Sequence, residues 1–279
     1  MRLYVFDDHR LGVLRGDDGL VDITELAGAV EPVDRMTALI DGWRELRDRV
    51  AAMLAAGPAV ALDAVNVRAP QPRPRTIVAA PVNYHLHQQE MDGIYGGAPV
   101  KTIETYAGFI KACSSIVGPD GSIELPFTDR RVDHEAELGV VIGRSARRVS
   151  RADALEFVFG YVPLLDITIR GDEDRSYRKS FDTFTPIGPA IVTADEVGDP
   201  RALDFWLTVN GELRQRANTR DMIYDVARLV ELYSHAMTLQ PGDLIASGTP
   251  EGVGPIVPGD RVTLTIPAVG ELAMDVRFR

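Results

Sequence analysis

Short apolar segments divided by turn residues make up most of the chain, and this pattern predicts many strands and few helices. The first such segments are Leu3–Phe6, Leu11–Leu14 and Leu20–Ile23, which Asp and Gly residues separate. A helical pattern follows, because apolar residues recur three or four positions apart and would share one face. These residues are Leu39, Trp43, Leu46, Val50 and Met53.

Three alternating prolines, Pro70, Pro72 and Pro74, interrupt the chain after this helix. Proline lacks a backbone N–H and fixes φ, so such a run fits neither a regular helix nor a central strand. The sequence therefore predicts a small N-terminal α/β domain at residues 1–66, a stiff Pro-rich linker at 67–75 and a larger domain at 76–279.

The larger domain shows more strand patterns than helical ones. One helix is predicted from about Thr219 to Met237, with Met222 on its apolar face. The dipeptide Asn210-Gly211 follows an apolar segment and predicts a hairpin turn. The predicted strands are Thr76–Ala80, Ile123–Leu125, Leu138–Ile142, Ala190–Val192, Phe205–Val209, Leu244–Ala246, Arg261–Ile266 and Leu272–Val276. We therefore expect an α+β fold that is mainly β.

Charge and cysteine content narrow the function classes. The 279 residues carry a net charge of −11, which argues against a nucleic-acid partner because a phosphate backbone requires a basic face. Cys113 is the only cysteine, so neither an internal disulfide nor a multi-cysteine zinc site can form. No segment resembles a membrane span, and the first residues lack the apolar region of a signal peptide. We expect a cytoplasmic protein with no membrane partner.

Two acidic residues stand at the start of a strongly apolar strand. Glu135 and Glu137 lie two positions apart, and such side chains share one face of a strand. Like charges at a buried strand repel each other and are costly to desolvate. A divalent cation that prefers oxygen ligands, such as magnesium, manganese or calcium, would compensate them. The alternative is an acidic edge strand that faces solvent.

Further candidate groups follow in the chain. Asp166 ends an apolar run from Tyr161 and is a candidate third metal ligand, although Asp is also a common cap or turn residue. Arg170 and Lys179 are candidates for binding a carboxylate substrate, and the alternative for each is an ordinary surface charge.

A histidine and a glutamate lie three positions apart after the strand predicted at Thr76–Ala80. If the segment starts a helix, His87 and Glu90 are neighbours on its surface. A carboxylate fixes the tautomer of an imidazole and raises its basicity, which produces a general base for water. The alternatives are an incidental pair on a surface turn, or a metal site formed by His85 and His87.

A glycine-rich segment, Pro241 to Gly254, follows the strand pattern near the C-terminus. Glycines let backbone N–H groups and Thr249 approach an anionic ligand closely, although Gly and Pro are also ordinary turn residues.

In combination, five blocks of this sequence resemble the fumarylacetoacetate hydrolase family, whose members include acylpyruvate hydrolases and 2-hydroxyhepta-2,4-diene-1,7-dioate isomerase-like proteins. They spread over most of residues 76–279, and the N-terminal unit matches only loosely. The blocks are Asn83-Tyr84 with His87 and Glu90, Phe109 to Gly118, Asp133 to Gly143, Lys179 to Thr193, and Gln240 to Gly254. The resemblance implies a mixed β-roll catalytic domain, a homodimer, and one Mg²⁺ or Mn²⁺ ion per subunit.

The resemblance also implies roles for individual residues. The metal ligands would be Glu135, Glu137 and Asp166. The catalytic residues would be His87 and Glu90, which activate water, and Lys179, which stabilises negative charge. The substrate site would be lined by Tyr84, Arg170, Thr249 and Lys111.

This chain departs from the usual family pattern near the expected pocket. Leu165 stands where Asn usually precedes the metal-binding Asp, and Ala112 replaces a frequent Pro. The run from Thr168 to Glu173 replaces the usual Ser-Ala-Arg-Asp, and Arg178 stands where Gly commonly precedes the Lys. The wall of the pocket is therefore expected to differ from that of relatives.

The implied reaction is hydrolysis of a C–C bond in an acylpyruvate-type 2,4-dioxo acid, through an enolate that the metal ion and Lys179 stabilise. Isomerisation or decarboxylation of a 2-oxo (di)acid in aromatic-compound catabolism is the alternative, because it uses the same enolate. A non-catalytic binding protein is a third possibility, and the intact set of ligands and catalytic residues argues against it.

Overall fold

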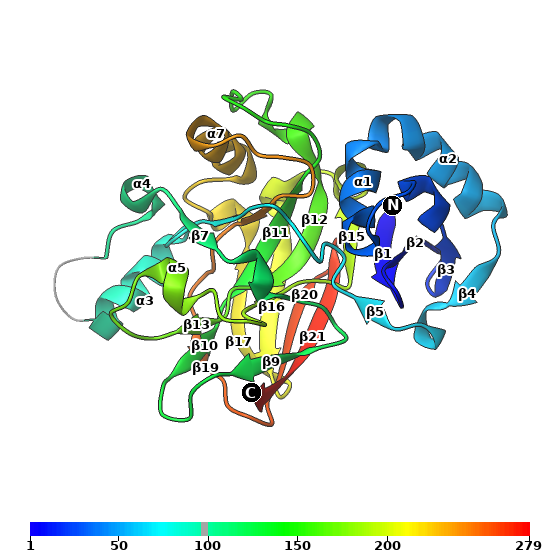
Figure 1. The fold of residues 1–279 in the computed structure, drawn as a ribbon. Coiled ribbons are helices and arrows are strands. Elements are labelled where there is room, and N and C mark those ends of the chain that lie inside the picture. Colours follow the sequence, from blue (N-terminus) through cyan, green and yellow to red (C-terminus); the bar gives the residue numbers. More distant parts are fainter. Residues whose placement is uncertain (96–99) are drawn as a thin grey trace.

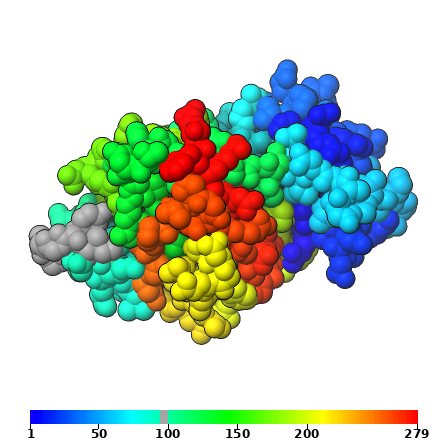
Figure 2. Space-filling view, turned by 90° about the horizontal axis from the view of Figure 1, so that it is seen from below, coloured from blue at the N-terminus to red at the C-terminus, as the bar shows by residue number. Residues whose placement is uncertain are grey.

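The computed structural model describes residues 1–95 and 100–279, and strands dominate it. Figure 1 shows the N-terminal segment (blue and cyan) beside a larger body built mainly of strands. Figure 2 shows the same segment as a lobe at one end of an elongated molecule. No helix within these ranges combines the length and the apolarity needed to cross a membrane. The α+β, mainly β prediction is confirmed.

The largest sheet of the described residues has eleven strands and carries the site. Its neighbours run in the order β4-β3-β2-β1-β15-β12-β11-β18-β6-β7, and β5 also pairs with β1. The strands are β1 (Arg2–Phe6), β2 (Arg10–Arg15), β3 (Gly19–Asp22), β4 (Ala59–Ala61), β5 (Val67–Arg68), β6 (Ile77–Ala79), β7 (Phe109–Lys111), β11 (Ala136–Ile142), β12 (Val158–Leu165), β15 (Ala190–Thr193) and β18 (Leu244–Ala246).

A five-stranded sheet, in the order β17-β16-β20-β21-β9, packs against one face of β12. Asn210-Gly211 joins β16 to β17, which confirms the predicted hairpin. Its strands are β9 (Ser122–Leu125), β16 (Asp204–Val209), β17 (Glu212–Asn218), β20 (Arg261–Ile266) and β21 (Gly270–Phe278). The small sheets are formed by β10 (Val132–His134), β13 (Thr168–Ile169) and β19 (Gly254–Pro255), and by β8 (Ile116–Val117) and β14 (Thr185–Pro186).

The central strands are buried on both faces, which explains their continuous apolar sequences. On β11, Val140 belongs to the core that also holds Leu264 of the five-stranded sheet. The next residue, Val141, belongs to the opposite core, together with Leu3 of β1. Since adjacent residues of a strand point to opposite faces, one short apolar strand supports both cores.

The N-terminal segment shares a sheet and a core with the rest of the chain. β1 pairs antiparallel with β15, with Leu3 opposite Ile191, and β5 brings the start of the predicted linker back onto β1. The domain boundary therefore stays a prediction, while the structure joins both sides of it by continuous backbone hydrogen bonding.

This continuity predicts a single cooperative thermal transition for the whole chain. Separating residues 1–66 would expose the edge of β15 and one face of the core, which is costly in water. Circular dichroism and intrinsic fluorescence should report coincident melting curves. Two separated transitions would show that the N-terminal segment unfolds independently.

Helices cover the edges and faces of the sheets, and two of the helical predictions need correction. The helix expected at residues 39–53 is divided at Gly42, a residue with low helix propensity, into α1 and α2. The helix expected from Thr219 begins only at Val226, where Asp225 accepts a hydrogen bond from the Arg228 N–H at 2.8 Å. The helices are α1 (Arg35–Asp41), α2 (Trp43–Ala56), α3 (His85–Tyr95), α4 (Ile103–Tyr106), α5 (Arg175–Arg178), α6 (Ala194–Val197) and α7 (Val226–Ala236).

The first residues of that second prediction adopt a different structure. Asn218 accepts a hydrogen bond from the Arg220 N–H at 3.0 Å and starts a short 3₁₀ turn, Thr219–Asp221. Met222 therefore lies before the helix, and its backbone forms a bridge to Tyr84. The local capping hydrogen bonds of Asn and Asp explain why the apolar spacing overestimated this helix.

Candidate functional site

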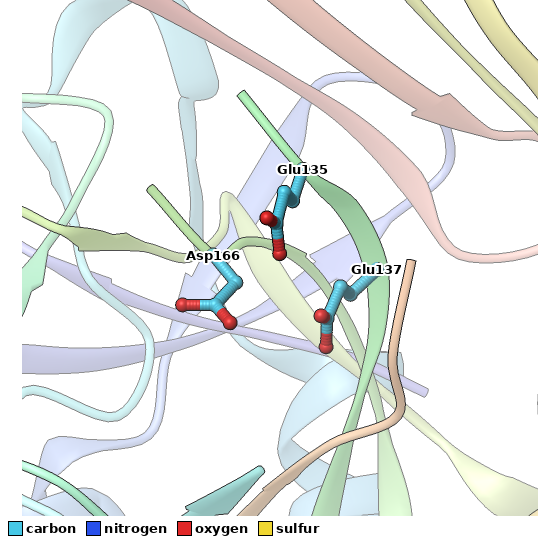
Figure 3. Close-up of side chains that lie close together, drawn as sticks. All are labelled: Glu135, Glu137 and Asp166. Atoms are coloured by element: carbon cyan, nitrogen blue, oxygen red, sulfur yellow. The ribbon is translucent and has the colours of Figure 1, made fainter. Parts of the chain in front are cut away.

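Three buried carboxylates meet where β11 begins and β12 ends (Figure 3). Glu135 lies between β10 and β11, Glu137 lies on β11, and Asp166 directly follows β12. The Asp166 N–H donates to the Glu135 carbonyl oxygen at 2.9 Å, which fixes the two backbones side by side. Ligand oxygens of the three side chains lie within 4.8 Å of one another. Glu135 and Glu137 thus converge, although the strand is interrupted at Glu135.

The carboxylates are unequally compensated. Burial acts to raise the pKa of Glu135, but the positive charges of Lys179 and Arg170 together hold this pKa below its ordinary value. Burial and the charge of Asp166 raise the pKa of Glu137 well above its ordinary value. Glu137 accepts a hydrogen bond from the Gly248 N–H at 2.8 Å, but no ion pair joins it to a cation of the described chain. A positive charge beside Glu137 would therefore stabilise the cluster.

Two lysines hold Asp166, one at each carboxylate oxygen. The Lys179 ammonium lies 2.7 Å from Asp166 Oδ2 and 2.7 Å from Glu135 Oε2. Burial would lower the pKa of Lys179, but these two carboxylates raise it above its ordinary value. Lys111 pairs with Asp166 Oδ1, donates to the Phe184 carbonyl oxygen at 3.0 Å, and is fully buried, which lowers its pKa. The lysines therefore fix the position of this predicted metal ligand.

Arg170 ties the same cluster to the neighbouring strand β10. Its Nε donates to Asp133 Oδ2 at 2.7 Å, and its Nη2 donates to Glu135 Oε1 at 3.0 Å. Arg170 thus supports the shape of the site as well as lining it.

The predicted dyad lies on α3. His87 Nδ1 is 3.0 Å from Glu90 Oε2, as their spacing predicts for a helix. The other oxygen, Glu90 Oε1, accepts a hydrogen bond from the Gly252 N–H at 3.0 Å. Just before the helix, Asn83 Nδ2 donates to the Ser247 carbonyl oxygen at 2.8 Å. Both contacts hold α3 against the glycine-rich segment, so His87 is oriented from two sides.

The glycine-rich segment is held in turn by a buried glutamine of β17. Gln215 Nε2 donates to Thr249 Oγ1 at 2.8 Å, and its Oε1 accepts from the Ala136 N–H at 3.0 Å. Gly252 has φ +90, and a Cβ there would lie 2.2 Å from the Arg214 carbonyl oxygen, so this close approach requires glycine. Sequence reasoning missed Gln215, because one glutamine in a polar strand carries no distinguishing signal.

Most of the predicted site residues line one pocket. They are Glu135, Glu137, Asp166, His87, Lys179, Arg170 and Thr249. Glu90 contacts His87 but does not line the pocket. Tyr84 and Lys111 are not among its lining residues: Tyr84 packs against Phe205, with ring centroids 6.4 Å apart, and Lys111 contacts Asp166. Substrate contacts for these two residues stay predictions.

Two arginines that the sequence reasoning did not assign also line this pocket. Arg175 and Arg178 are the first and last residues of α5, directly before Lys179. The sequence feature that could have identified them is Arg178, which stands where the family commonly has Gly.

The donor set fits a divalent metal ion. Three carboxylates supply oxygen ligands of the kind that Mg²⁺ and Mn²⁺ prefer, and the uncompensated charge of Glu137 favours a cation. Glu135, Glu137 and Asp166 would hold the ion. A carboxylate triad, an imidazole–carboxylate dyad and a buried ammonium in one site define a metal-dependent enzyme of mainly β fold.

Sequence comparison places this enzyme in a known family. Residues 76–277 match the family described as fumarylacetoacetate (FAA) hydrolase C-terminal, and the chain belongs to it. The chain is similar to maleylpyruvate hydrolase of Aquipseudomonas alcaligenes, with 42% identity in an alignment that is 286 residues long and covers 99% of each protein.

Solved structures agree with this assignment. Maleylpyruvate hydrolase from Sphingobium sp. SYK-6, in complex with manganese(II) and pyruvate, has a TM-score of 0.89 and 44% identity, with 100% of this chain and 99% of that chain covered. A 5-carboxymethyl-2-hydroxymuconate delta-isomerase from Mycobacterium smegmatis has a TM-score of 0.77 and 33% identity, with the same coverage. Hydrolases and isomerases therefore share this fold.

Proposed function

We propose that this protein is a divalent-metal-dependent hydrolase that cleaves a C–C bond in maleylpyruvate or a closely related acylpyruvate. The main support for this proposal is that the carboxylate triad and His87 line one pocket. Lys179 pairs with two of the three carboxylates. The full-length similarity to maleylpyruvate hydrolases supports the choice of substrate.

The reaction consumes one water molecule. The water oxygen bonds to the distal carbonyl carbon, the adjacent C–C bond breaks, and its electron pair passes to the pyruvate enolate. Protonation of the enolate carbon then gives pyruvate beside a carboxylic acid. A divalent cation held by Glu135, Glu137 and Asp166 would supply Lewis-acid stabilisation of the negative charge that develops on the substrate oxygens.

His87 is the base in this proposal. Glu90 accepts a hydrogen bond from His87 Nδ1, which leaves the Nε2 lone pair available to take a proton from water. Burial of His87 limits competition from bulk solvent. Lys179 places a buried positive charge beside the ligands, where it opposes the charge of the enolate.

Replacing Glu90 with glutamine is expected to lower kcat by roughly 100-fold, because the neutral amide does not stabilise the imidazolium that forms on His87. Steady-state kinetics and a pH–rate profile would measure this effect. Gln89→Ala is the matched control, since Gln89 is exposed at the preceding position of the same helix. Unchanged kcat in Glu90→Gln would contradict the dyad.

A substrate screen tests the proposed reaction. Maleylpyruvate, fumarylpyruvate and acetylpyruvate would be incubated with Mg²⁺, with Mn²⁺ and with EDTA, followed by mass spectrometry of the products in H₂¹⁸O. Metal-dependent formation of pyruvate and an acid that carries one ¹⁸O is expected. A product of unchanged mass would indicate isomerisation, the activity named for the similar M. smegmatis protein, and CO₂ release would indicate decarboxylation.

We also infer that the protein is a cytoplasmic homodimer. Exposed apolar side chains near the pocket, Tyr106, Ile110 and Tyr177, support a subunit interface, and the presence of only one cysteine is compatible with a reducing compartment. Light scattering coupled to size exclusion would measure the assembly, and cell fractionation would locate the protein. A monomer at micromolar concentration would contradict the dimer.

A further inference from the structure

Four cationic side chains line the pocket, and they differ in how their charges are compensated. Arg170 and Lys179 pair with the carboxylates of the site. Arg175 and Arg178 form no ion pair with a carboxylate in the described part of the chain. The positive charges of Arg175 and Arg178 are therefore not paired with a carboxylate of the described residues.

The contacts of these two arginines leave their charges uncompensated. Arg178 is only 9% exposed, and its Nε donates to the Glu173 backbone oxygen at 3.1 Å. The Arg175 guanidinium lies over the ring of Tyr106, 4.1 Å from its centroid. A carbonyl group and an aromatic ring stabilise a guanidinium without neutralising it.

The nearest acidic side chains are Glu173 and Asp174. Their hydrogen bonds and, more weakly, the charge of Arg178 lower the pKa of both carboxyls. Neither carboxylate forms an ion pair with Arg175 or Arg178 in the described part of the chain. The Glu173 carboxylate accepts hydrogen bonds from both terminal nitrogens of Arg130, at 2.7 and 2.9 Å. The Asp174 carboxylate accepts from the Ser176 N–H at 2.8 Å and caps α5. A buried guanidinium without a counter-charge is costly, so an anionic group from outside the chain would stabilise this end of α5.

We propose that Arg178, assisted by Arg175, binds the second carboxylate of a dicarboxylic acylpyruvate and thereby selects dicarboxylic over monocarboxylic substrates. This inference rests on the proposed function and deepens it. The carboxylate triad would hold the cation that binds the 2-oxo acid end of the substrate, and the two arginines would bind the opposite end. Guanidinium groups suit this role, because they bind a carboxylate through two parallel hydrogen bonds.

Kinetics on two substrates separate this role from a structural one. Arg178→Gln is expected to lower kcat/KM for maleylpyruvate roughly 100-fold more than it lowers kcat/KM for acetylpyruvate, which lacks the second carboxylate. Arg175→Gln, which breaks no backbone contact, is expected to shift the same ratio in the same direction. Arg261→Gln, an exposed arginine paired with Asp275, is the matched control and should leave both values unchanged.

An equal loss for both substrates would overturn the proposal, because it would show that Arg178 only supports the turn through its contacts with backbone oxygens. An unchanged ratio in both variants would overturn it as well. Arg178→Lys, which keeps the charge but loses the paired donors, should fall between the wild-type protein and Arg178→Gln.

Measurements of equilibrium binding test the arginine site independently of the proposed hydrolysis. Calorimetry with Mn²⁺ present would compare 2-oxoheptanedioate with 2-oxoheptanoate, which differ only in the second carboxylate. Wild-type protein is expected to bind the first roughly 100-fold more tightly, and Arg178→Gln should remove this preference. Absence of cleavage with an intact preference would refute only the hydrolase assignment, whereas equal affinities would refute the arginine site.

Discussion

Replacing His87 with alanine is expected to lower kcat for acylpyruvate hydrolysis by roughly 1,000-fold, while the protein retains its affinity for Mn²⁺. The imidazole lies in the pocket with the carboxylate triad, but it is not among the three clustered ligands. Its loss therefore removes the proposed base without removing one of the three predicted oxygen ligands. Stopped-flow or steady-state assays would measure the rate, and calorimetry would measure the metal affinity.

His85 provides a matched control for this experiment. It begins the same helix but is exposed, and it does not line the pocket. His85→Ala should therefore leave kcat unchanged, and this result would also exclude the alternative metal site formed by His85 and His87. If His87→Ala kept wild-type activity, water would have to be activated by another group and the proposed mechanism would be wrong. If it lost Mn²⁺ instead, His87 would be a ligand.

The sequence predicted the parts of the site that depend on local geometry. Spacing of two along a strand places Glu135 beside Glu137, and spacing of three on a helix places Glu90 beside His87. An apolar run that ends in Asp166 was enough to suggest a third acidic group. Each of these pairs is close in the sequence, so the periodicity of a strand or a helix is enough to predict that the two side chains are neighbours.

Contacts between distant segments were not predictable in this way. Gln215 of β17 reaches Thr249 and Ala136, and Glu90 reaches the N–H of Gly252, across separations that no local pattern encodes. The same limit explains why the N-terminal segment was expected as a separate unit, although β1 pairs with β15. Pairing of strands far apart in sequence is decided by the packing of both sheet faces, which the periodicity of one strand does not specify.

The resemblance to the family implies that Lys111 contacts the substrate, which stays a prediction, and the structure adds that Lys111 pairs with Asp166. Family motifs identify which residues gather at a site, but burial and hydrogen bonding decide what each residue contacts. Arg178 illustrates the converse, because a departure from the family pattern points to a residue that lines the pocket.

Neutralising the predicted metal ligands Asp166 and Glu137 is expected to have unequal consequences for the free energy of unfolding of the protein without metal. Asp166→Asn leaves Lys111, which is fully buried, without a carboxylate as its ion-pair partner, and it removes one of two carboxylates from Lys179. An uncompensated buried charge should lower the free energy of unfolding by about 3 kcal/mol or more. Urea denaturation in EDTA would measure this loss.

Glu137→Gln is the matched comparison at the same site. Burial raises the pKa of Glu137, and no lysine or arginine of the described chain forms an ion pair with it. Removing its charge should therefore leave the free energy of unfolding in EDTA within about 1 kcal/mol of wild type. Both variants should also bind Mn²⁺ more weakly. The loss of affinity should exceed roughly 10–100-fold, which is the usual effect of replacing a residue that only supports a metal ligand.

Mn²⁺ affinity and stability in EDTA, measured together, distinguish a residue that binds the metal from one that compensates a buried charge. If both variants lost metal but only Asp166→Asn lost stability, Asp166 would serve as ligand and as counter-ion for the lysines, while Glu137 would serve the cation alone. Equal destabilisation in EDTA would contradict this division, because it would mean that Glu137 also compensates a buried charge. Retained Mn²⁺ affinity in either variant would remove that residue from the ligand set.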